Sequence, residues 1–584
     1  MESNQELQNK RHSLAHLLAA AVIKLYPGTK RTIGPAIDNG FYYDFEFKEP
    51  ITDKDLPKIE KEMEKLQKTW TTFERKEVSA DQAREMFKDN PYKLELIEEF
   101  SKEGQTLTIY KSSEYFEDLC RGGHADDMSK IDPESYKLTK IAGAYWRGDE
   151  KNKMLTRIYG VAFDTKDELG KYLKMLEEAE KRDHKVLGPK LGLFTFSELV
   201  GPGLPMFLPK GMEIIRQLEE FVRDEKIKRG YSFVRIPHIA KTDLYKKSGH
   251  LGKYDAMMPI MKDGEGNEMV MKAMNCPHHF ELYNAQPHSY RDLPIRYAET
   301  TAVYRNEKSG ELSGLLRVKA LTQDDTHHFV RHDQIGAEIE MILSLMEVVY
   351  GSFGFSDFLV QISTRDQKNK EKYFGTDELW EKSESILIEA VKKWGKPYIV
   401  EEGEAAFYGP KIDIMVKDAI GRSWQLTTVQ LDFNQPENFD MNYTAEDGQK
   451  HRPAVLHVAI LGSVERFLGV LIEHYAGAFP LWLSPAQIII LPIGENQVVY
   501  AKKVCDALLA ANPGLRIEID DRAESVGKKI REAAMQKIPY QLIVGEKEVE
   551  AGKVAVRLRD GSDLGQMPIT DFAERVKDEI KNKY

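Results

Sequence analysis

Two breaks limit how this chain can fold. The first is the glycine- and proline-rich stretch GPKLGLFTFSELVGPGLPMFLPKG at residues 188–211, and the second surrounds Trp482–Pro485. Glycine and proline interrupt helices and strands, so both places indicate the entry to a new domain. With 584 residues, the chain is also too long for a single hydrophobic core. We therefore predict three domains, at residues 1–185, 186–484 and 485–584.

The composition is that of an ordinary globular protein. Apolar residues make up 41% and charged residues 30%, which excludes a wholly disordered or collagen-like chain. The net charge of −11 repels phosphate, so contact with nucleic acid would require a local basic patch. The three cysteines, Cys120, Cys276 and Cys505, are scattered and odd in number, which argues against a disulfide framework. The first residues lack the apolar core of a signal peptide and no stretch is long enough to cross a membrane, so we expect a cytoplasmic protein without membrane contact.

Local patterns indicate both helices and strands. Asn39-Gly40 between alternating aromatic residues predicts a hairpin, and YSFVRIPHI at residues 231–239 is typical of a strand. Beyond residue 485, short apolar runs alternate with helical patterns, which favours a small α/β domain with a parallel-biased sheet. Apolar residues at helical spacing predict helices at residues 13–25, 165–182 and 212–228.

Two pairs of ligand-type side chains stand out near the N-terminus. His12 and His16 in RHSLAH are four residues apart and would share one face of a helix. Cys120 and His124 in DLCRGGH have the same spacing. The four side chains could bind a metal ion, or they could supply a nucleophile with its bases. They could equally be two unrelated pairs, a half-buried histidine pair and a glycine turn.

The middle of the chain holds two further candidates. AMNCPHH at residues 273–279 is, by itself, as consistent with a buried thiol as with a metal ligand. Residues 301–329 indicate two strands around a charged loop. Arg305, Glu307 and Arg317 on such a hairpin would suit a triphosphate with its metal ion, because arginine binds phosphate in a bidentate manner. An exposed charged hairpin without a ligand is the alternative.

An apolar run with an embedded arginine follows later. HVAILGSVERF at residues 457–467 predicts a buried strand that leads into a buried helix. A buried arginine is costly unless it is paired or bound to an anion, so Arg466 is a candidate anion ligand. The sequence contains no glycine-rich phosphate loop of the P-loop or dinucleotide type, so a nucleotide would need another mode of binding.

Taken in order, these blocks resemble the signatures of the class II aminoacyl-tRNA synthetases, and specifically the threonyl-tRNA synthetase family. GYSFVRIP at residues 230–237 resembles the first signature, YRNE with Leu316-Arg317 the second, and LGSVERF at residues 461–467 the third. AFYGPKID and WQLTTVQLDF between them also match, and the resemblance covers nearly the whole chain. It implies an α+β multidomain fold: an N-terminal α+β editing domain, a class II core with an antiparallel sheet and helices, and a C-terminal α/β anticodon-binding domain.

The resemblance implies one zinc ion per subunit in an aminoacylation pocket. Its ligands would be Cys276, His327 (the histidine that directly follows DDT) and His457. Three protein ligands leave zinc open for the amino and hydroxyl groups of threonine. Valine lacks that hydroxyl, but serine differs only by a methyl group, a difference of roughly 1–3 kcal/mol. A second, hydrolytic site that removes serine from tRNA is therefore implied.

The N-terminal motifs resemble that editing site. In this family the site is understood to hydrolyse seryl-tRNA without a required metal, which disagrees with the metal-like spacing, and we follow the family. The residues that match, with two expected companions, are His12, His16, Cys120 and His124, and Lys93 and Asp118.

The remaining roles implied by the resemblance concern ATP and threonine. Arg305 would hold the α-phosphate and the carboxylate, Arg317 and Arg466 the other phosphates, with Mg²⁺ bridging phosphate oxygens. Glu307 would lie near adenine, and Asp325 would suit the ammonium group. The residues expected to line the ATP and threonine pockets are Gln323, Asp325, Tyr408, Lys411, Gln425 and Thr428.

The C-terminal block resembles the anticodon-binding domain for tRNA(Thr). Basic and acidic residues are equally numerous from residue 485 onward, so recognition must depend on a local patch. Lys547, Glu548 and Arg557 are the candidates, because arginine and glutamate can read unstacked base edges. In the family the first signature lies at a dimer interface, so a homodimer with residues 230–237 at its two-fold interface is expected.

Two departures and two alternatives remain. Only eleven residues precede His12, where family members commonly carry a ubiquitin-like domain, so that domain is expected to be missing. Val318 is followed by Lys-Ala-Leu, where Arg-Gly-Phe is commoner.

A prolyl or seryl enzyme of class II would lack the Cys/His/His set. A catalytically inactive, synthetase-like RNA-binding regulator would be expected to lose Arg305, Arg466 or a zinc ligand.

Overall fold

The computed structural model describes residues 2–70, 72–113, 116–149, 151–418 and 421–583. The chain divides into two compact units, unit 1 at Met1–Glu177 and unit 2 at Glu178–Tyr584, and the division falls within helix α5 (Lys166–Arg182). The predicted boundary at residue 185 lies just beyond this helix, and both later predicted domains fall in unit 2. Among the described residues, no helix has both the length and the apolar character that crossing a membrane requires.

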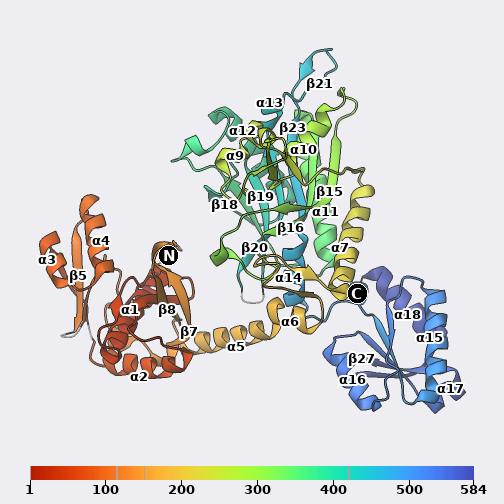
Figure 1. Ribbon diagram of the computed structural model, residues 1–584, viewed down its shortest axis with the longest axis horizontal. Coiled ribbons are helices and arrows are strands. Elements are labelled where there is room, and N and C mark those ends of the chain that lie inside the picture. The colour runs from red at the N-terminus through yellow and green to blue at the C-terminus, as the bar shows by residue number, and fades with distance from the viewer. Residues whose placement is uncertain (1, 71, 114–115, 150, 419–420, 584) are drawn as a thin grey trace. The chain divides into compact units, whose positions relative to one another are not determined.

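Unit 1 is built on helix α1 (Glu2–Leu25), which packs against an antiparallel sheet (Figure 1). Leu14, Leu18 and Val22 follow helical spacing and are fully buried, so the helix predicted at residues 13–25 is confirmed, although it begins earlier. The sheet consists of β1 (Lys30–Arg31), β2 (Ala36–Ile37), β3 (Gly40–Glu46), β7 (Tyr136–Tyr145) and β8 (Met154–Ala162). Its order is β1-β3-β8-β7, and β2 pairs with β3 across a tight loop, which confirms the predicted hairpin.

Lys93 lies at the start of a helix that accompanies a smaller antiparallel sheet in unit 1. Asn90 caps the helix that follows it, because its side-chain oxygen accepts the N–H of Lys93 at 3.4 Å. Pro91 takes the first helical position, where its missing N–H costs nothing. The elements are β4 (Glu74–Val78), β5 (Leu107–Ser113) and β6 (Phe116–Leu119), with helices α3 (Ala80–Met86) and α4 (Pro91–Lys102).

Unit 2 contains an eight-stranded, mostly antiparallel sheet. In spatial order its strands are β11 (Ser232–Phe233), β15 (Ile295–Tyr304), β16 (Ala320–Val330), β23 (Ala454–Ser463), β20 (Ser423–Asp432), β19 (Lys411–Lys417), β17 (Leu359–Thr364) and β18 (Tyr398–Glu402). The β15–β16 pair confirms the hairpin predicted at residues 301–329. Buried β23 leads directly into buried helix α14 (Val464–His474), as predicted. The register of β16 against β23 sets His327 directly opposite His457.

Helices cover one face of this sheet. Asp324 and His328 of β16 point to α7 (Pro209–Ile227) and α11 (Ile335–Ser352), where they pair with Lys226 and Glu338. Successive side chains of a strand alternate between its two faces. Gln323, Asp325 and His327 therefore face the other side of the sheet.

The strand predicted at residues 231–239 is largely wrong. Only Ser232–Phe233 joins the large sheet, in parallel with β15, and Ile239–Lys241 (β12) belongs to a separate small sheet. The pairing with β15 ends before Pro237 is reached: the N–H of Val234 still donates to the carbonyl of Ala298, but the N–H of Ile236 donates to the Glu299 side chain.

The C-terminal part of unit 2 has its own sheet (Figure 1). It also has its own hydrophobic clusters. Its strands are β25 (Ile517–Ile519), β24 (Ile488–Pro492), β26 (Tyr540–Val544), β27 (Lys553–Leu558) and β28 (Asp563–Pro568), in that order. The predicted parallel bias holds only for β24 with β25 and β26. The later pairs are antiparallel because their connections are too short for a crossover. The helices are α15 (Val498–Ala511), α16 (Val526–Met535), α17 (Glu546–Ala551) and α18 (Ile569–Asn582).

Candidate functional site

A pocket of about 300 Å³ lies on the face of the large sheet that carries Asp325 and His327. Its walls come from distant parts of unit 2, including β16, β19, β20, β23 and the start of α10 (Cys276–Asn284). All residues that the sequence analysis assigned to metal, nucleotide or amino acid line it: Cys276, Arg305, Glu307, Arg317, Gln323, Asp325, His327, Tyr408, Lys411, Gln425, Thr428, His457 and Arg466.

Three of these side chains form a compact donor set. The ligand atoms of Cys276, His327 and His457 lie within 4.8 Å of one another, and all three residues are buried. His327 Nε2 is 3.1 Å from His457 Nδ1, and two nitrogens on a tetrahedral zinc are separated by about 3.3 Å. Burial raises the pKa of the Cys276 thiol well above its ordinary value, and Asp325 and Asp432 act in the same direction. A metal ion that binds here would therefore displace the thiol proton.

Neighbouring groups orient the two histidines. His457 Nε2 donates to Asp432 Oδ2 at 3.0 Å, which leaves its Nδ1 as a lone pair that faces His327. His327 Nδ1 lies 2.8 Å from Nδ1 of His279. Metal-binding histidines commonly have such outer partners. The donors and their orientation fit a zinc ion with an open position.

Strand alternation distinguishes His327 from its neighbour. His328 Nδ1 lies 3.0 Å from Glu338 Oε2, on the far face of the sheet. Glu338 also receives two hydrogen bonds from Arg296. His328 is thus part of a structural ion-pair group and does not reach the pocket.

Positive charge is concentrated in the same pocket. Arg466 donates from Nε to the carbonyl of Leu316 at 2.8 Å and from Nη1 to that of Gln425 at 2.9 Å. Burial lowers its pKa to about 10, and the positive charges of Arg305 and Arg317 add to the effect. Three arginines held together in this way favour a multiply charged anion as ligand.

Asp413 was missed by the sequence analysis, yet it organises one wall of the pocket. Its buried carboxylate accepts hydrogen bonds from Gln425 at 2.6 Å and Thr428 at 3.0 Å and pairs with Lys411. Ser363 donates to it at 2.9 Å from β17. The alternating pattern of KIDIMV, with a carboxylate inside a buried strand, was the available signal.

His184 was also missed. Its Nδ1 lies 2.7 Å from Glu473 Oε1, and its Nε2 accepts the N–H of Leu315 at 3.0 Å. Leu315 immediately precedes the Leu316-Arg317 segment of the pocket. This histidine therefore supports the loop that presents Arg317, although no local motif identifies it.

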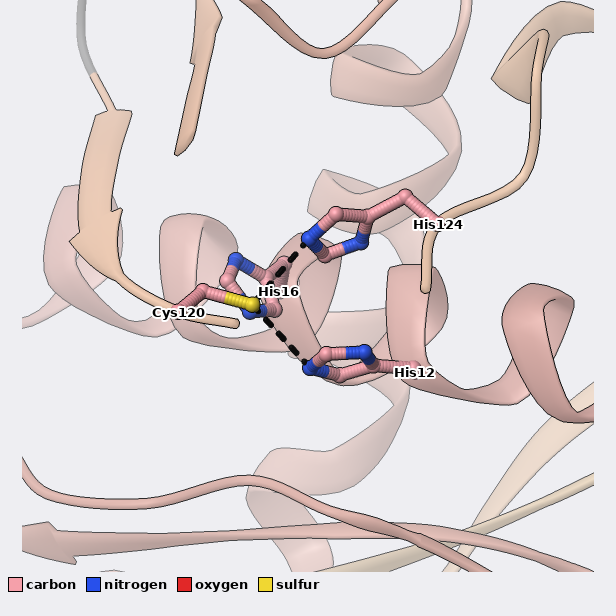
Figure 2. A group of neighbouring side chains, drawn as sticks. All are labelled: His12, His16, Cys120 and His124. Carbon is pink, nitrogen blue, oxygen red and sulfur yellow. Dashed lines mark hydrogen bonds between the residues drawn. The ribbon is translucent and has the colours of Figure 1, made fainter. Parts of the chain in front are cut away.

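A second pocket, of about 400 Å³, lies in unit 1 and is lined by all the predicted editing residues except His124. His12, His16, Lys93, Asp118 and Cys120 line it. Figure 2 shows His12, His16 and His124 gathered around the Cys120 sulfur, and their ligand atoms all lie within 4.8 Å of one another. Burial lowers the pKa of all three histidines, that of His124 to about 3, and raises the pKa of Cys120 to about 11. The group is uncharged at neutral pH.

Asp118 and Lys93 form a buried ion pair beside this group, with 2.8 Å between Nζ and Oδ1. Tyr43 donates to Asp118 Oδ2 at 2.5 Å, and Arg31 Nε lies 3.3 Å from Oδ1. Although burial opposes it, Lys93 and Arg31 hold the pKa of Asp118 well below its ordinary value. Asp118 is thus an ionised, fully hydrogen-bonded anchor for Lys93, and Tyr43 and Arg31 are further residues that sequence reasoning missed.

The anticodon candidates are placed unequally. Lys547 is exposed on α17, and Arg557 is half-buried on β27. Glu548 is buried, and its carboxylate accepts the N–H of Gly545 at 2.9 Å and a side-chain N–H of Gln566 at 2.5 Å. Because that carboxylate already accepts hydrogen bonds within the domain, Lys547 and Arg557 are better candidates than Glu548 for contact with anticodon bases.

Comparisons with known proteins agree with this arrangement. A family described as "tRNA synthetase class II core domain (G, H, P, S and T)" matches residues 260–475. An "Anticodon binding domain" matches residues 487–579, and a "Threonyl and Alanyl tRNA synthetase second additional domain" matches residues 107–159.

Individual relatives cover most of the chain. The threonine--tRNA ligase of Cytophaga hutchinsonii is 51% identical over 574 residues, 97% of this chain and 88% of that protein. The one from Rubrobacter xylanophilus is 49% identical over 582 residues, 99% and 90% of the two chains. A solved structure titled as the RNA binding domain of threonyl-tRNA synthetase from Cryptosporidium parvum Iowa II is 38% identical, with a TM-score of 0.64, and covers 68% of this chain and 98% of that one. On identities near one half over nearly its whole length, with residues of the second and third signatures gathered in one pocket, this chain belongs to the threonyl-tRNA synthetase family.

Proposed function

We propose that the protein activates L-threonine with ATP to threonyl-adenylate and transfers the threonyl group to the 3′ end of tRNA(Thr). The observation that carries this proposal is the convergence of Arg305, Arg317 and Arg466 with a Cys/His/His donor set in a single pocket. An inactive RNA-binding regulator would have no need to keep both groups together.

Cys276, His327 and His457 would hold one Zn²⁺ per subunit. When bound there, the ion would act as a Lewis acid with an open position for the amino and hydroxyl groups of threonine. Asp432 and His279 keep the two imidazoles in place. Valine would leave the coordination position and nearby polar groups unpaired, which is the basis of its rejection.

The surrounding side chains would stabilise the negative charge that develops during adenylate formation. The threonine carboxylate attacks the α-phosphate of ATP and pyrophosphate leaves with the bridging oxygen, so negative charge accumulates around phosphorus. Arg305 is assigned to the α-phosphate and carboxylate, and Arg317 and Arg466 to the other phosphates, while Mg²⁺ accompanies ATP. Asp325 is buried and suits the ammonium group, beside Gln323 and Tyr408. Glu307, which lies 2.9 Å from Arg317, is assigned to the adenine side.

The unit 1 pocket is assigned to hydrolysis of seryl-tRNA(Thr). Neutral histidines and Lys93 can hold a water molecule against the ester carbonyl and bind the 3′ ribose by hydrogen bonding and charge. The extra methyl group of threonine would be rejected sterically, so the second site accepts serine alone. This chemistry requires no metal ion.

The remaining partners follow from the family. The C-terminal domain would bind the anticodon through Lys547 and Arg557, and the enzyme would work as a homodimer in the cytoplasm. The expected interface includes residues 230–237, and light scattering at working concentration tests it, because a monomer would contradict it.

ATP–pyrophosphate exchange with threonine, serine and valine is the decisive experiment. We expect strong exchange with threonine, weaker exchange with serine by about 10- to 200-fold, and almost none with valine. Exchange that is absent with threonine, or equal for valine and threonine, would overturn the proposal.

A further inference from the structure

The unit 1 pocket has one cation that no carboxylate balances. The histidines and the thiol that line the pocket are uncharged near neutral pH, because burial lowers the pKa of the histidines and raises that of the thiol. Lys93 is paired with Asp118 at 2.8 Å, and Arg31, behind the pocket wall, contacts the same carboxylate at 3.3 Å. Among the described residues that line the pocket, Arg121 is the remaining charged side chain.

The guanidinium of Arg121 is held by an aromatic ring and keeps its donors available. Arg121 is exposed although it lines the pocket, and its guanidinium carbon lies 4.4 Å from the centroid of the Phe100 ring, which lines the same pocket. Contact with an aromatic face leaves the N–H groups at the edge of the guanidinium free to donate. Glu99, whose carboxylate feels the charge of Arg121, is paired with Arg147. Within the part of the chain that the structure describes, Arg121 has no ion-pair partner.

The backbone around Arg121 fixes where this side chain starts. The N–H of Cys120 donates to the carbonyl of Thr108 at 3.1 Å, which ties the preceding residue to strand β5. Gly122 and Gly123, which follow directly, have φ values of 100° and 82°, and such values favour glycine. The chain therefore turns sharply after Arg121, and the arginine stays at the mouth of the pocket beside Cys120.

The 3′ end of an aminoacyl-tRNA has a matching distribution of charge. The terminal adenine, the ribose and the ester carry no negative charge, whereas the phosphate on the 5′ side of that nucleotide carries one. The pocket, of about 400 Å³, has apolar walls that suit an unstacked base, formed by Ile33, Pro35, Leu96 and Leu107. An uncharged interior with one unbalanced cation at its mouth therefore suits a terminal nucleoside ester with its 5′-phosphate.

We propose that Arg121 binds the phosphate on the 5′ side of the terminal nucleotide while the ester occupies the interior of the pocket. Arginine can bind two phosphate oxygens at once, which would fix the orientation of the nucleotide as well as attract it. This assignment rests on the proposed editing function and adds a residue that recognises the nucleic-acid backbone. Because Arg121 would not touch the amino acid, it would strengthen binding without discriminating serine from threonine.

Two small esters that differ by one phosphate test this assignment on the full-length protein. One is adenosine that carries serine on its ribose, and the other has an additional 5′-phosphate. We expect the wild type to hydrolyse the phosphorylated ester with a kcat/KM about tenfold higher. Arg121→Ala should remove this preference and hydrolyse the phosphate-free ester as the wild type does. Arg121→Lys should keep part of the preference, because the charge remains while the bidentate contact is lost.

An exposed arginine of unit 1 outside the pocket supplies the matched control. Arg84, on α3, is paired with Asp81 and Glu98, and Arg84→Ala should keep the full preference for the phosphorylated ester. Equal hydrolysis of the two esters by the wild type, or a preference that survives Arg121→Ala, would overturn the assignment. Equal loss of activity on both esters in Arg121→Ala would indicate a structural role and would also overturn it.

Seryl-tRNA provides a second measurement. Arg121→Ala should raise the KM for seryl-tRNA hydrolysis and lower the slope of log KM against log salt concentration by about 0.7, the value for one phosphate contact on a single strand. An unchanged slope would contradict the phosphate contact. A wild type that hydrolyses neither ester nor seryl-tRNA would instead contradict the proposed editing function itself, and with it the basis of this assignment.

Discussion

The two cysteine–histidine groups consist of the same residue types, but the chain brings their members together in different ways. Cys276, His327 and His457 come from a helix and two strands and meet because β16 and β23 pair in one register. His12 with His16, and Cys120 with His124, are local pairs with a spacing of four, brought together by packing of unit 1. The first group lies in a pocket that three arginines line. The cations that line the pocket of the second group are Arg121 and Lys93, and Lys93 is paired with Asp118.

The difference shows that ligand identity alone does not assign a role. Both groups have donors at distances that suit zinc. Their surroundings differ: three arginines beside the first group favour ATP, whereas the second pocket has apolar walls, one buried ion pair and a single further cation, Arg121, which suits an ester. Variants that remove one feature at a time can test this contrast.

The largest effect is expected for Cys276→Ala. Loss of one of three ligands should remove zinc from the aminoacylation pocket and abolish threonine-dependent pyrophosphate exchange. Elemental analysis and the exchange assay measure the two effects. Cys505→Ala, at a half-buried thiol in the C-terminal domain, is the control and should change neither. Full exchange in a Cys276→Ala enzyme would show that this group is not the catalytic one.

Arg305→Ala tests the charge that distinguishes the first pocket. Removal of one group that stabilises developing negative charge should lower exchange by about 10²- to 10³-fold, with normal folding and zinc content. Arg291→Ala, at an exposed arginine, provides a matched control. Unchanged exchange would remove Arg305 from the mechanism.

The double change His12→Ala and His16→Ala should affect only the second pocket. Seryl-tRNA hydrolysis should fall by about 10²-fold, because groups that position water are lost, while threonine charging is retained. Accumulation of seryl-tRNA is the measurement, and His451→Ala, at an exposed histidine, is the control. Loss of charging in the double variant would mean that the two sites are not separable.

Asp432→Asn should have the smallest effect, on the outer partner of His457. An amide orients the imidazole less well, so zinc affinity should fall by about 10- to 100-fold in a chelator competition. Asp447 makes an exposed contact with His451 at 3.2 Å, and Asp447→Asn should leave zinc affinity unchanged. Equal affinities for wild type and Asp432→Asn would show that the outer carboxylate has no such role.

Much of the architecture could be predicted from local patterns. Helical spacing predicted α1 and α5, and the Asn39-Gly40 turn predicted a hairpin. The pattern failed for the strand-like run at residues 231–239: β11 ends at Phe233, and the N–H of Ile236 donates to the Glu299 side chain and not to a neighbouring strand. Whether neighbouring C-terminal strands run parallel or antiparallel also depends on the length of the connection between them, and a pattern of apolar runs does not predict that.

The site was predicted unevenly for a related reason. Arg305, Glu307, Arg317 and Arg466 were candidates from their local patterns, but the roles of the other pocket residues came from the family resemblance. No spacing rule would have joined His327 to His457. Asp413, Asp432 and His279 were missed because each acts through another side chain, and His184 because it supports the main chain at Leu315. Their roles depend on which neighbours pack against them, and that information is absent from any short window of sequence.

The sequence by itself determined the local pairs, because residues four apart on a helix share a face whatever surrounds them. It also determined that Arg466 would be embedded in apolar residues and would need a partner. Only the tertiary structure decided which of His327 and His328 faces the pocket, because strand pairing and covering helices choose the face. It also decided the hydrogen-bond partners of His12 and His124, since Gly123 and Ser13 reach the two imidazoles only after unit 1 has folded.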